Sequence, residues 1–252
     1  VATKIAIGYN LDEIKNEVTG VTYACFEPAI DYVVAKIPKW PFKKFLTANR
    51  NLGTQMKATG EVMAIAPTLE ASLMKAIRSL EENVEEFYLD KFKDYTKEEL
   101  EEKLKDVDNE RIFVIAEAIR KEISVEKIKD ITAIDKFFIG AIYNIIRMET
   151  ELKVNQFSVS LIKKAKTLGF TDKIIAKYTG KTEEEIKNFR YDNGIIANYK
   201  MVDTCAAEFD AETAYYYSSY DDENEVYKSD KKKIMVLGSG PIRIGQGIEF
   251  DC

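Results

Sequence analysis

The pattern of hydrophobic and polar residues divides the chain into three parts, and the first, residues 1–82, mixes strand and helix patterns. Residues 30–37 are β-branched and aromatic and predict a strand that ends at Pro38. Residues 54–65 alternate enough to predict one strand, or two short ones, with a bend or bulge at Gly60. Strands are therefore expected before the first long helix.

That helix is expected directly after Pro67, which breaks the strand, and Thr68, whose hydroxyl suits a helix N-cap. Its apolar residues recur at helical spacing, as they do on the buried face of an amphipathic helix. They are Leu69, Leu73, Met74, Ala76, Ile77 and Leu80.

The second part, residues 81–200, has an almost wholly helical pattern. Two capping boxes, Thr96 with Glu99 and Thr182 with Glu185, mark helix starts, because in each the two side chains satisfy free backbone donors. An all-helical central domain is therefore predicted.

Within this domain, one long buried helix is predicted from apolar residues at helical spacing. These residues are Ile131, Ile134, Phe137, Phe138, Ala141, Ile142, Ile145, Ile146 and Met148. Three short helices are predicted over residues 158–168, 171–179 and 182–191. The glycines just past their ends suit the left-handed residue that closes a helix, and they are Gly169, Gly180 and Gly194.

The third part begins with a tyrosine-rich stretch, residues 214–220, that is predicted to be extended, and a charged linker over residues 221–233. Residues 233–237 predict a buried strand that runs into Gly238 and Gly240. Doubly wound sheets open a nucleotide or phosphate loop in this way, but the later glycines depart from the G-x-G-x-x-G spacing. The alternative is a first Rossmann-like strand whose glycines serve a tight turn.

Composition and charge exclude several classes of protein. The 252 residues are 46% hydrophobic and 32% charged with a formal net charge of −6, which is typical of a globular protein and of neither disorder nor a basic nucleic-acid binder. The chain has no histidine, so an imidazole base, a His–Asp relay and a histidine metal ligand are excluded.

The three cysteines, Cys25, Cys205 and Cys252, are far apart and form no C-x-x-C, so a zinc cluster and a disulfide framework are not expected. No apolar run approaches the ~20 residues that span a bilayer, and no signal peptide opens the chain. We expect a cytoplasmic protein without nucleic acid or membrane partners, and a chain cut at both ends from a longer polypeptide.

Several local features have an unremarkable interpretation that is favoured over a functional one. The carboxylates between residues 61 and 86 are expected to be solvated rather than metal-binding, with Glu61 beside Gly60 the one retained as a candidate. Lysines on the three short helices suggest a helix-turn-helix, but the glutamates among them favour a structural module. Cys205 is expected to be a buried, inert thiol, and residues 215–217 to pack in a sheet.

Four segments together resemble one family closely. They are FEPAIDYVV at 26–34, QMK through GEVMAI at 55–65, VDTCAAEF at 202–209, and IMVLGSGPIRIGQGIEFD at 234–251. In sequence, order and approximate spacing they are similar to the large subunit of carbamoyl-phosphate synthetase.

The resemblance implies a mixed fold and a division into three domains. Residues 1–82 would be the α+β C-terminal part of the first, carboxyphosphate-forming ATP-grasp domain. Residues 83–228 would be the all-α oligomerization domain. Residues 229–252 would be a linker, one Rossmann-like strand and the glycine loop that open the second synthetase domain.

The resemblance also implies an activity for the parent protein, an ATP-dependent ligase that makes carbamoyl phosphate from bicarbonate, ammonia and two ATP. The parent would use ATP with Mg²⁺ or Mn²⁺, and K⁺ is a further candidate. A glutaminase small subunit would supply the ammonia, and the product could serve arginine or pyrimidine biosynthesis.

This piece would associate with itself through the helical domain. It carries no catalytic, cofactor-binding or metal-binding residue of the family, so it is expected to be inactive alone. The candidate carbamate-tunnel residues that it would contribute are Arg243, Gly247 and Glu249.

Two other functions remain open from the residues themselves. One is a freestanding helical binding module, with nucleic acid as a weak candidate ligand that the acidic composition disfavours. The other is a small intact ATP-using enzyme, which would need a phosphate loop with its helix and a full set of metal ligands, and the sequence contains neither.

Overall fold

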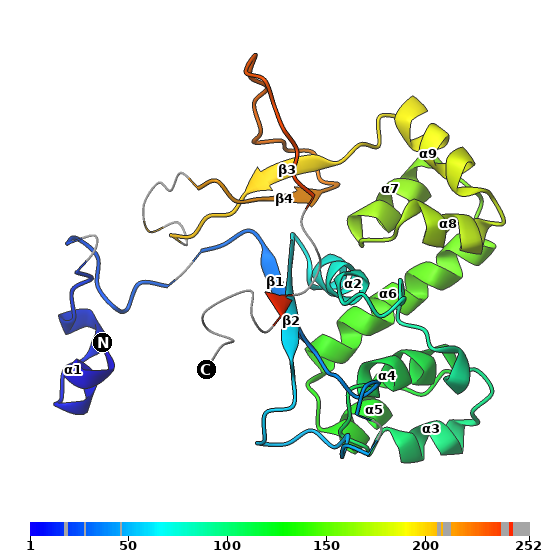
Figure 1. Cartoon of the computed structure of the whole chain (residues 1–252), viewed down its shortest axis with the longest axis horizontal. Coiled ribbons are helices and arrows are strands. Elements are labelled where there is room, and N and C mark those ends of the chain that lie inside the picture. The colour runs from blue at the N-terminus through cyan, green and yellow to red at the C-terminus, as the bar shows by residue number, and fades with distance from the viewer. Residues whose placement is uncertain are drawn as a thin grey trace.

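The computed structural model shows a central sheet, a helical body beside it and a two-stranded sheet above (Figure 1). It describes residues 1–17, 20–27, 29–45, 47–205, 208 and 213–237, and the backbone of residues 242–243.

The central sheet is antiparallel with strand order β1-β2-β5. Its strands are β1 (Val33–Lys39), β2 (Gly60–Ala66) and β5 (Ile242–Arg243). Both strands predicted in the first part of the chain are present, but β2 begins at Gly60, whereas the predicted strand ran from residue 54 through Gly60.

The prediction that Pro38 ends the first strand is wrong, because Pro38 lies within β1 opposite Glu61. Among the described strands, β1 pairs with β2 alone and so lies at the edge of the sheet. A proline, which has no N–H to donate, is tolerated in such an edge strand.

One face of the sheet is covered by α2 (Leu69–Ser79). The Thr68 hydroxyl accepts a hydrogen bond from the Ala71 amide at 3.2 Å, which confirms the predicted N-cap. The apolar face is confirmed as well, with Met74 and Ile77 fully buried. The strand residues on this side of the sheet are small or β-branched, so the helix packs closely on them.

The helical body contains seven helices among the described residues. They are α3 (Lys97–Lys103), α4 (Arg111–Arg120), α5 (Val125–Thr132), α6 (Lys136–Val154), α7 (Val159–Thr167), α8 (Asp172–Thr179) and α9 (Glu183–Asp192). A 3₁₀ turn, Asp90–Phe92, leads into them.

The helix ends follow the predicted signals. In both capping boxes the glutamate accepts from the threonine amide at 2.7 Å and the threonine hydroxyl accepts from the glutamate amide at 3.2 Å. The three short helices lie within one or two residues of their predicted bounds. The glycines that follow them have the expected positive φ values of 89°, 68° and 68° for Gly169, Gly180 and Gly194.

The predicted long helix begins later than expected, because Ile131 and Ile134 are not part of it. Ile131 belongs to α5, which ends at Ala133 in the left-handed conformation. Asp135 then caps a new helix by accepting from the Phe137 amide at 2.8 Å. The resulting α6 is the longest described helix and runs diagonally between α4 and α5 at one end and α7 and α8 at the other (Figure 1).

The smaller sheet pairs β3 (Asn198–Met201) with β4 (Tyr216–Ser219) in antiparallel register. The prediction that residues 214–220 have an extended backbone is confirmed by β4. β3 falls at the end of the stretch that was predicted to be helical, so that prediction is wrong there. Four residues are too few for alternation to stand out from the helix before them.

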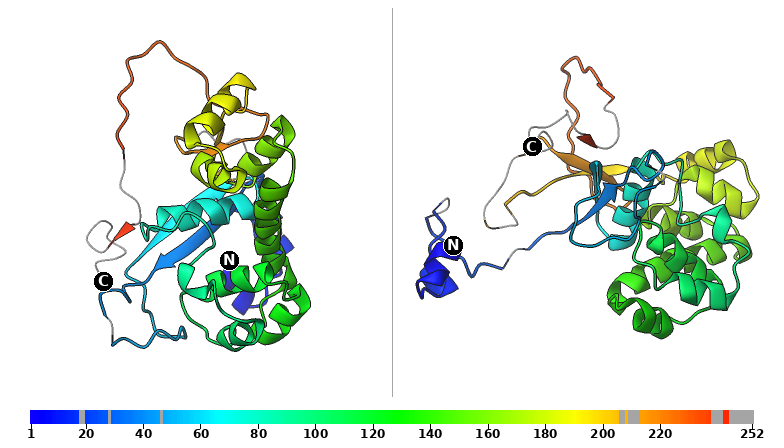
Figure 2. Two further views of the ribbon diagram at one scale, coloured as in Figure 1. Left: turned by 90° about the vertical axis from the view of Figure 1, so that its right-hand side faces the viewer. Right: turned by 60° about the horizontal axis from the view of Figure 1, so that its bottom comes forward.

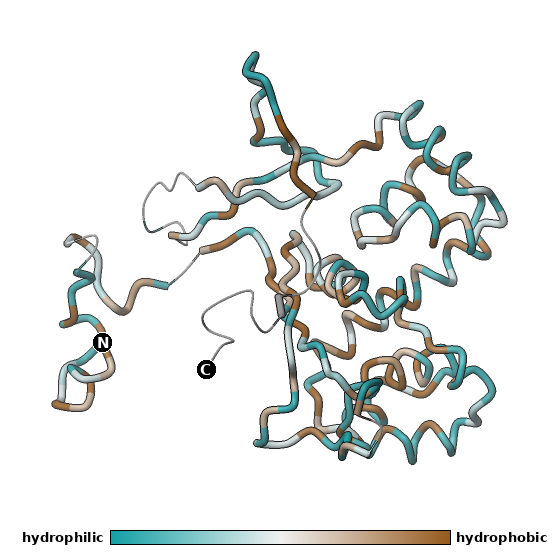
Figure 3. Tube along the Cα trace, in the orientation of Figure 1, coloured by the Kyte–Doolittle hydropathy of each residue, from teal (hydrophilic) through white to brown (hydrophobic). Residues whose placement is uncertain are grey.

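The two ends of the chain extend from this body. The N-terminal segment, with α1 (Ala2–Ala6) and the 3₁₀ turn Leu11–Glu13, stands apart from the helical body in Figure 1 and in the right-hand view of Figure 2. The predicted strand over residues 233–237 is wrong, because no strand is formed there and Ile234 is 93% exposed. This apolar stretch has no described sheet to bury it and stands out in the hydropathy trace of Figure 3.

Candidate functional site

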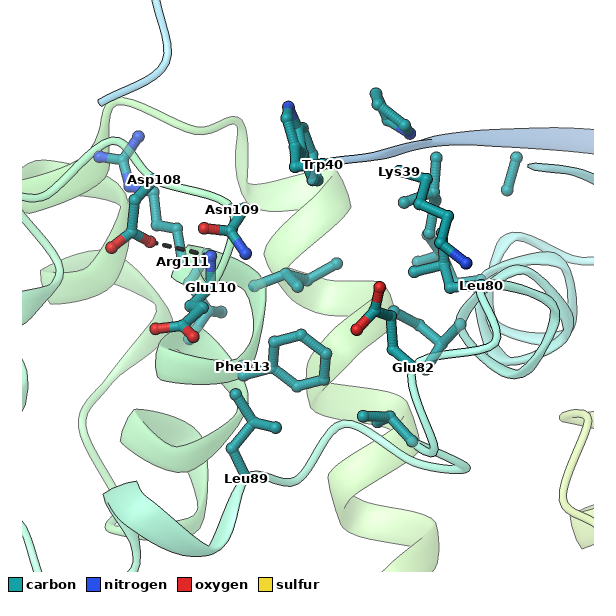
Figure 4. A pocket seen from close by; sticks show the side chains of 18 of the residues that line it. Lys39, Trp40, Leu80, Glu82, Leu89, Asp108, Asn109, Glu110, Arg111 and Phe113 are labelled. Carbon is teal, nitrogen blue, oxygen red and sulfur yellow. Dashed lines mark hydrogen bonds between the residues drawn. The ribbon is translucent and has the colours of Figure 1, made fainter. Parts of the chain in front are cut away.

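A groove of about 730 Å³ lies between β1, α2, α4 and α6 (Figure 4). Its walls are apolar, with Leu73 and Ile77 from α2, Phe113 from α4 and Ile142 from α6. Trp40, just after β1, closes one side. The volume lies within the range of small-molecule pockets, so the groove is large enough to hold a ligand or a side-chain cluster.

Charged side chains that form ion pairs surround the apolar walls of the groove. Lys43 pairs with Glu82, and both Lys91 and Arg50 reach Glu110, the latter at 3.9 Å. Exposed pairs of this kind contribute little stability. They surround an apolar surface with charges of both signs, which is also how the rim of a protein interface is built.

Two polar side chains of the groove lack the usual partners. The Asn109 side-chain oxygen is buried and has no hydrogen bond among the described residues. The Arg111 guanidinium donates to the carbonyls of Leu104 and Thr132, at 3.1 and 3.2 Å, and burial lowers its pKa. The groove therefore offers binding groups, but among the described residues it contains no nucleophile with a base beside it.

A second polar cluster joins segments that are distant in the sequence. The ammonium of Lys200, on β3, lies 3.2 Å from Asp31, 3.5 Å from Asp221 and 3.1 Å from Glu223. Burial opposes the charge of Lys200, but the hydrogen bonds to Glu223 and Asp31 outweigh it and raise its pKa. The cluster ties the segment before β1 and the linker after β4 to the small sheet.

Further hydrogen bonds strengthen the same connection. The Tyr32 hydroxyl donates to the Asp203 carbonyl at 2.7 Å, and the Asn16 amide donates to Glu208 at 2.7 Å. Asp203 and Glu208 both belong to the VDTCAAEF motif. The motif that was quoted for its family resemblance thus anchors the N-terminal segment.

Lys75, on α2, reaches the backbone of β2 and of β4 with its ammonium. Its ammonium donates to the carbonyls of Ile65, at 2.9 Å, and Ser218. Burial and the nearby charge of Arg78 lower the pKa of Lys75 to about 8. The lysine joins the helix to both sheets through these hydrogen bonds, and its ammonium also lies 5.8 Å from the centroid of the Tyr217 ring.

One buried ion-pair cluster of the helical body, around Arg120, has a structural role. The Arg120 guanidinium makes a bidentate contact with Glu149, at 2.9 and 2.7 Å, and a third with Glu117 at 3.1 Å. Burial disfavours the charge on Arg120, yet its bonds to Glu149 raise the pKa. The pair joins α4 to α6 and leaves no free group for chemistry.

The predicted tunnel residues lie at the edge of what the structure describes. The backbone of Arg243 lies in β5, opposite Gly60 of β2. Gly247 and Glu249 lie outside the described residues, as do the loop glycines Gly238 and Gly240.

Three of the carboxylates between residues 61 and 86 contact different partner residues. Glu61 pairs with Lys36 at 2.9 Å, Glu70 accepts from the Asn144 amide at 2.8 Å, and Glu86 accepts from Tyr178 at 2.6 Å. Within the described part of the chain, no three potential metal ligands come together.

The remaining predictions are confirmed or corrected by burial. Cys205 is half-buried rather than buried. Of the three tyrosines at 215–217, Tyr217 alone is buried, and burial raises its pKa to about 12. The pattern of aromatic residues did not indicate the groove around Trp40, since its walls come from four separate elements. None of the described helices is long and apolar enough to span a membrane.

Comparison with known proteins adds a family assignment to this geometry. The family model for the carbamoyl-phosphate synthetase large chain, oligomerisation domain, matches residues 61–194, which is more than half of the chain. A second model, for the carbamoyl phosphate synthase preATP-grasp domain, matches residues 230–252. The first match covers β2 through α9 and thus the whole helical body.

One similar protein is the carbamoyl phosphate synthase large chain of Agathobacter rectalis. It is 56% identical over 252 residues, which is 100% of this chain and 24% of that protein. The chain therefore spans about a quarter of the length of this relative.

Proposed function

The chain belongs to the family of carbamoyl-phosphate synthetase large chains that contain the oligomerisation domain, and from this we propose that it is the central part of such a large chain. The parent protein would make carbamoyl phosphate from bicarbonate, ammonia and two ATP. The observation that carries the proposal is the alignment of the whole chain with a quarter of one large chain at 56% identity.

We further propose that this part links two synthetase halves and does not itself catalyse the reaction. Residues 1–82 would complete the first ATP-grasp domain, and residues 83–228 would form the oligomerization domain. Residues 229–252 would be the linker, the first Rossmann-like strand and the glycine loop of the second synthetase domain. The match of the preATP-grasp model to residues 230–252 supports the last boundary. ATP with Mg²⁺ or Mn²⁺, and the glutaminase small subunit, would bind elsewhere in the parent protein, in the cytoplasm.

Arg243, Gly247 and Glu249 are proposed to line a passage for carbamate. Glycine leaves space, and a carboxylate and a guanidinium offer hydrogen bonds to a small polar intermediate. The pairing of Ile242 and Arg243 with Glu61 and Gly60 is the described contact of this segment, and it places the backbone of Arg243 beside β2. Glu249→Ala in the parent protein should leave bicarbonate-dependent ATP hydrolysis intact and reduce carbamoyl phosphate formation, and equal losses of both would contradict the role.

The proposed association is tested by sedimentation velocity over a wide concentration range. We expect a dimer or larger species that grows with concentration, since the family model describes an oligomerisation domain. A monomer at every concentration, both for the 252-residue chain and for the full-length protein, would refute the proposal.

The proposed lack of catalysis by this part has its own test. The purified 252-residue chain should show no bicarbonate-dependent ATP hydrolysis, because the described residues hold no cluster of metal ligands for the phosphates. Activity that survives repurification and remains proportional to the chain's concentration would contradict the assignment.

A further inference from the structure

The outward face of α6 exposes aromatic side chains to solvent. Phe137 is 68% exposed and Tyr143 is 45% exposed, while the opposite side of the helix is buried from Ile139 to Leu152. The two aromatic residues are six positions apart and Gly140 lies midway between them. Phe137 also packs edge-to-face on Phe138, which is 53% exposed, at a centroid distance of 5.4 Å.

Gly140 has no explanation within the described structure. It lies inside a 19-residue helix, where glycine is less favourable than alanine. A Cβ built on Gly140 would meet no described atom within 4 Å. By contrast, a Cβ on Gly169 would meet the Ala71 backbone at 3.1 Å, so that glycine is required by packing inside the chain.

A glycine on a helix surface lets another helix approach closely, because the separation of two helix axes depends on the side chains at the contact. The aromatic residues on either side of Gly140 would then form the walls of a shallow notch. A second helix with the same arrangement fits this notch, since its own glycine removes the obstacle on the other side.

The positions along α6 are self-complementary about Gly140. If two copies of α6 pack antiparallel around a two-fold axis at this glycine, the residue numbers that face each other add up to 280, twice 140. Phe137 then faces Tyr143 of the second copy, and Tyr143 faces Phe137. Lys136 faces Asn144 of the second copy, whose side-chain oxygen can accept a hydrogen bond from the ammonium.

We propose that the protein self-associates through the outward face of α6, with two copies packed antiparallel about a two-fold axis at Gly140. The inference rests on the proposed self-association and specifies the surface that carries it. α6 lies wholly within residues 61–194, the range matched by the oligomerisation-domain model. A two-fold contact uses the same patch on both copies, as this patch allows.

The first test is Gly140→Ala in the full-length protein and in the 252-residue chain. An added methyl group has space in the single copy and favours the helix, so the unfolding midpoint of the dilute, monomeric protein should rise. In the dimer the same methyl group lies at the crossing point, so the dissociation constant should rise by about tenfold or more, as for a central interface residue. Greater stability of the monomer together with weaker dimerisation would distinguish an interface from a surface that simply tolerates the added methyl group.

Matched controls keep this test specific. Val154, at the other end of α6, is 72% exposed and would face position 126, outside the helix. Val154→Ser should leave the dissociation constant unchanged, whereas Phe137→Ser should raise it. Equal effects of the two serine variants would show that the association depends on surface apolarity alone and would overturn the proposal.

The second test is disulfide trapping. A Phe137→Cys/Tyr143→Cys double variant should form a covalent dimer under mild oxidation, because each introduced thiol faces the other in the second copy. The two single variants should form no more dimer than the unmodified chain, since like positions lie on opposite sides of the two-fold axis, about 9 Å apart along the helix at 1.5 Å per residue.

The outcomes separate this inference from the proposed function. If the unmodified protein associates but Gly140→Ala and the double cysteine variant behave like their controls, another face of the domain makes the contact and this inference is wrong. If the full-length protein is monomeric at every concentration, the proposed self-association fails as well. Association of the 252-residue chain that the full-length protein lacks would show that another part of the large chain covers α6, which also overturns the inference.

Discussion

The loop between α7 and α8 offers a quantitative test of how the helical body is attached to the sheet. Gly169 has a φ of +89°, and its carbonyl accepts a hydrogen bond from Arg78 of α2 at 2.8 Å. A Cβ at this position would lie 3.0 Å from the Met74 Cβ and 3.2 Å from the Ala71 carbonyl oxygen. Gly169→Ala should therefore combine backbone strain with a clash against the helix backbone.

The two contributions can be estimated separately. The left-handed conformation destabilises an alanine by about 1–2 kcal/mol. Overpacking against atoms that cannot move freely adds about 1–3 kcal/mol. Gly180 is the matched control, because its φ is +68° but a Cβ there would meet nothing within 4 Å. Gly180→Ala should therefore show only the first contribution.

The assay is urea unfolding followed by circular dichroism of the helices, with both variants and the unmodified chain at one protein concentration. With a slope of about 2 kcal/mol per molar urea, an extra 1–3 kcal/mol moves the midpoint by about 0.5–1.5 M more in Gly169→Ala than in Gly180→Ala. Equal shifts of the two midpoints would refute the reasoning, because they would show that the contact between α2 and this loop yields without a penalty.

Two further predictions concern charged groups in the interior. Glu149→Ala leaves the buried Arg120 guanidinium without its bidentate partner, so urea unfolding should show that the free energy of unfolding falls by about 3–5 kcal/mol. The exposed Glu102, which pairs with Lys105, is the control, and a similar fall in Glu102→Ala would contradict the argument. For Lys75 the pKa of about 8 lies below its ordinary value of 10.5, so between these pH values the unfolded chain binds the extra proton and stability should rise with pH. Unfolding free energies measured from pH 7 to 11 should therefore rise more for the unmodified chain than for Lys75→Met, and parallel profiles would show that the pKa is not lowered.

Much of the helical body was predictable because its signals are local. A threonine followed three residues later by a glutamate fixes a helix start through bonds within one turn, and Thr96 and Thr182 both behave in this way. The same holds for Gly180 and the end of α8. Where two local signals compete, as at Ala133 and Asp135, the apolar spacing alone suggested a continuous helix and missed the break.

The candidate site was less predictable because it depends on contacts between distant segments. Nothing near Lys200 in the sequence indicates that Asp31 will lie 3.2 Å from it. The groove likewise needs Trp40, Leu73 and Phe113 from three different elements. Pro38 within β1 is a third case, since proline is tolerated in an edge strand and the local sequence does not show which strand forms the edge.

The bonds that hold the N-terminal segment also bear on the order in which the chain folds. Tyr32 and Asp203 are 171 positions apart, and Asn16 and Glu208 are 192 apart. Contacts between such distant positions form late, because closing a long loop precedes any gain from the contact. The helices from α3 to α9 pack mainly on near neighbours in the sequence, so during synthesis they can assemble first. The hydrogen bonds of Asn16 and Tyr32 can then form only after the VDTCAAEF motif has been made, so the N-terminal segment is attached last.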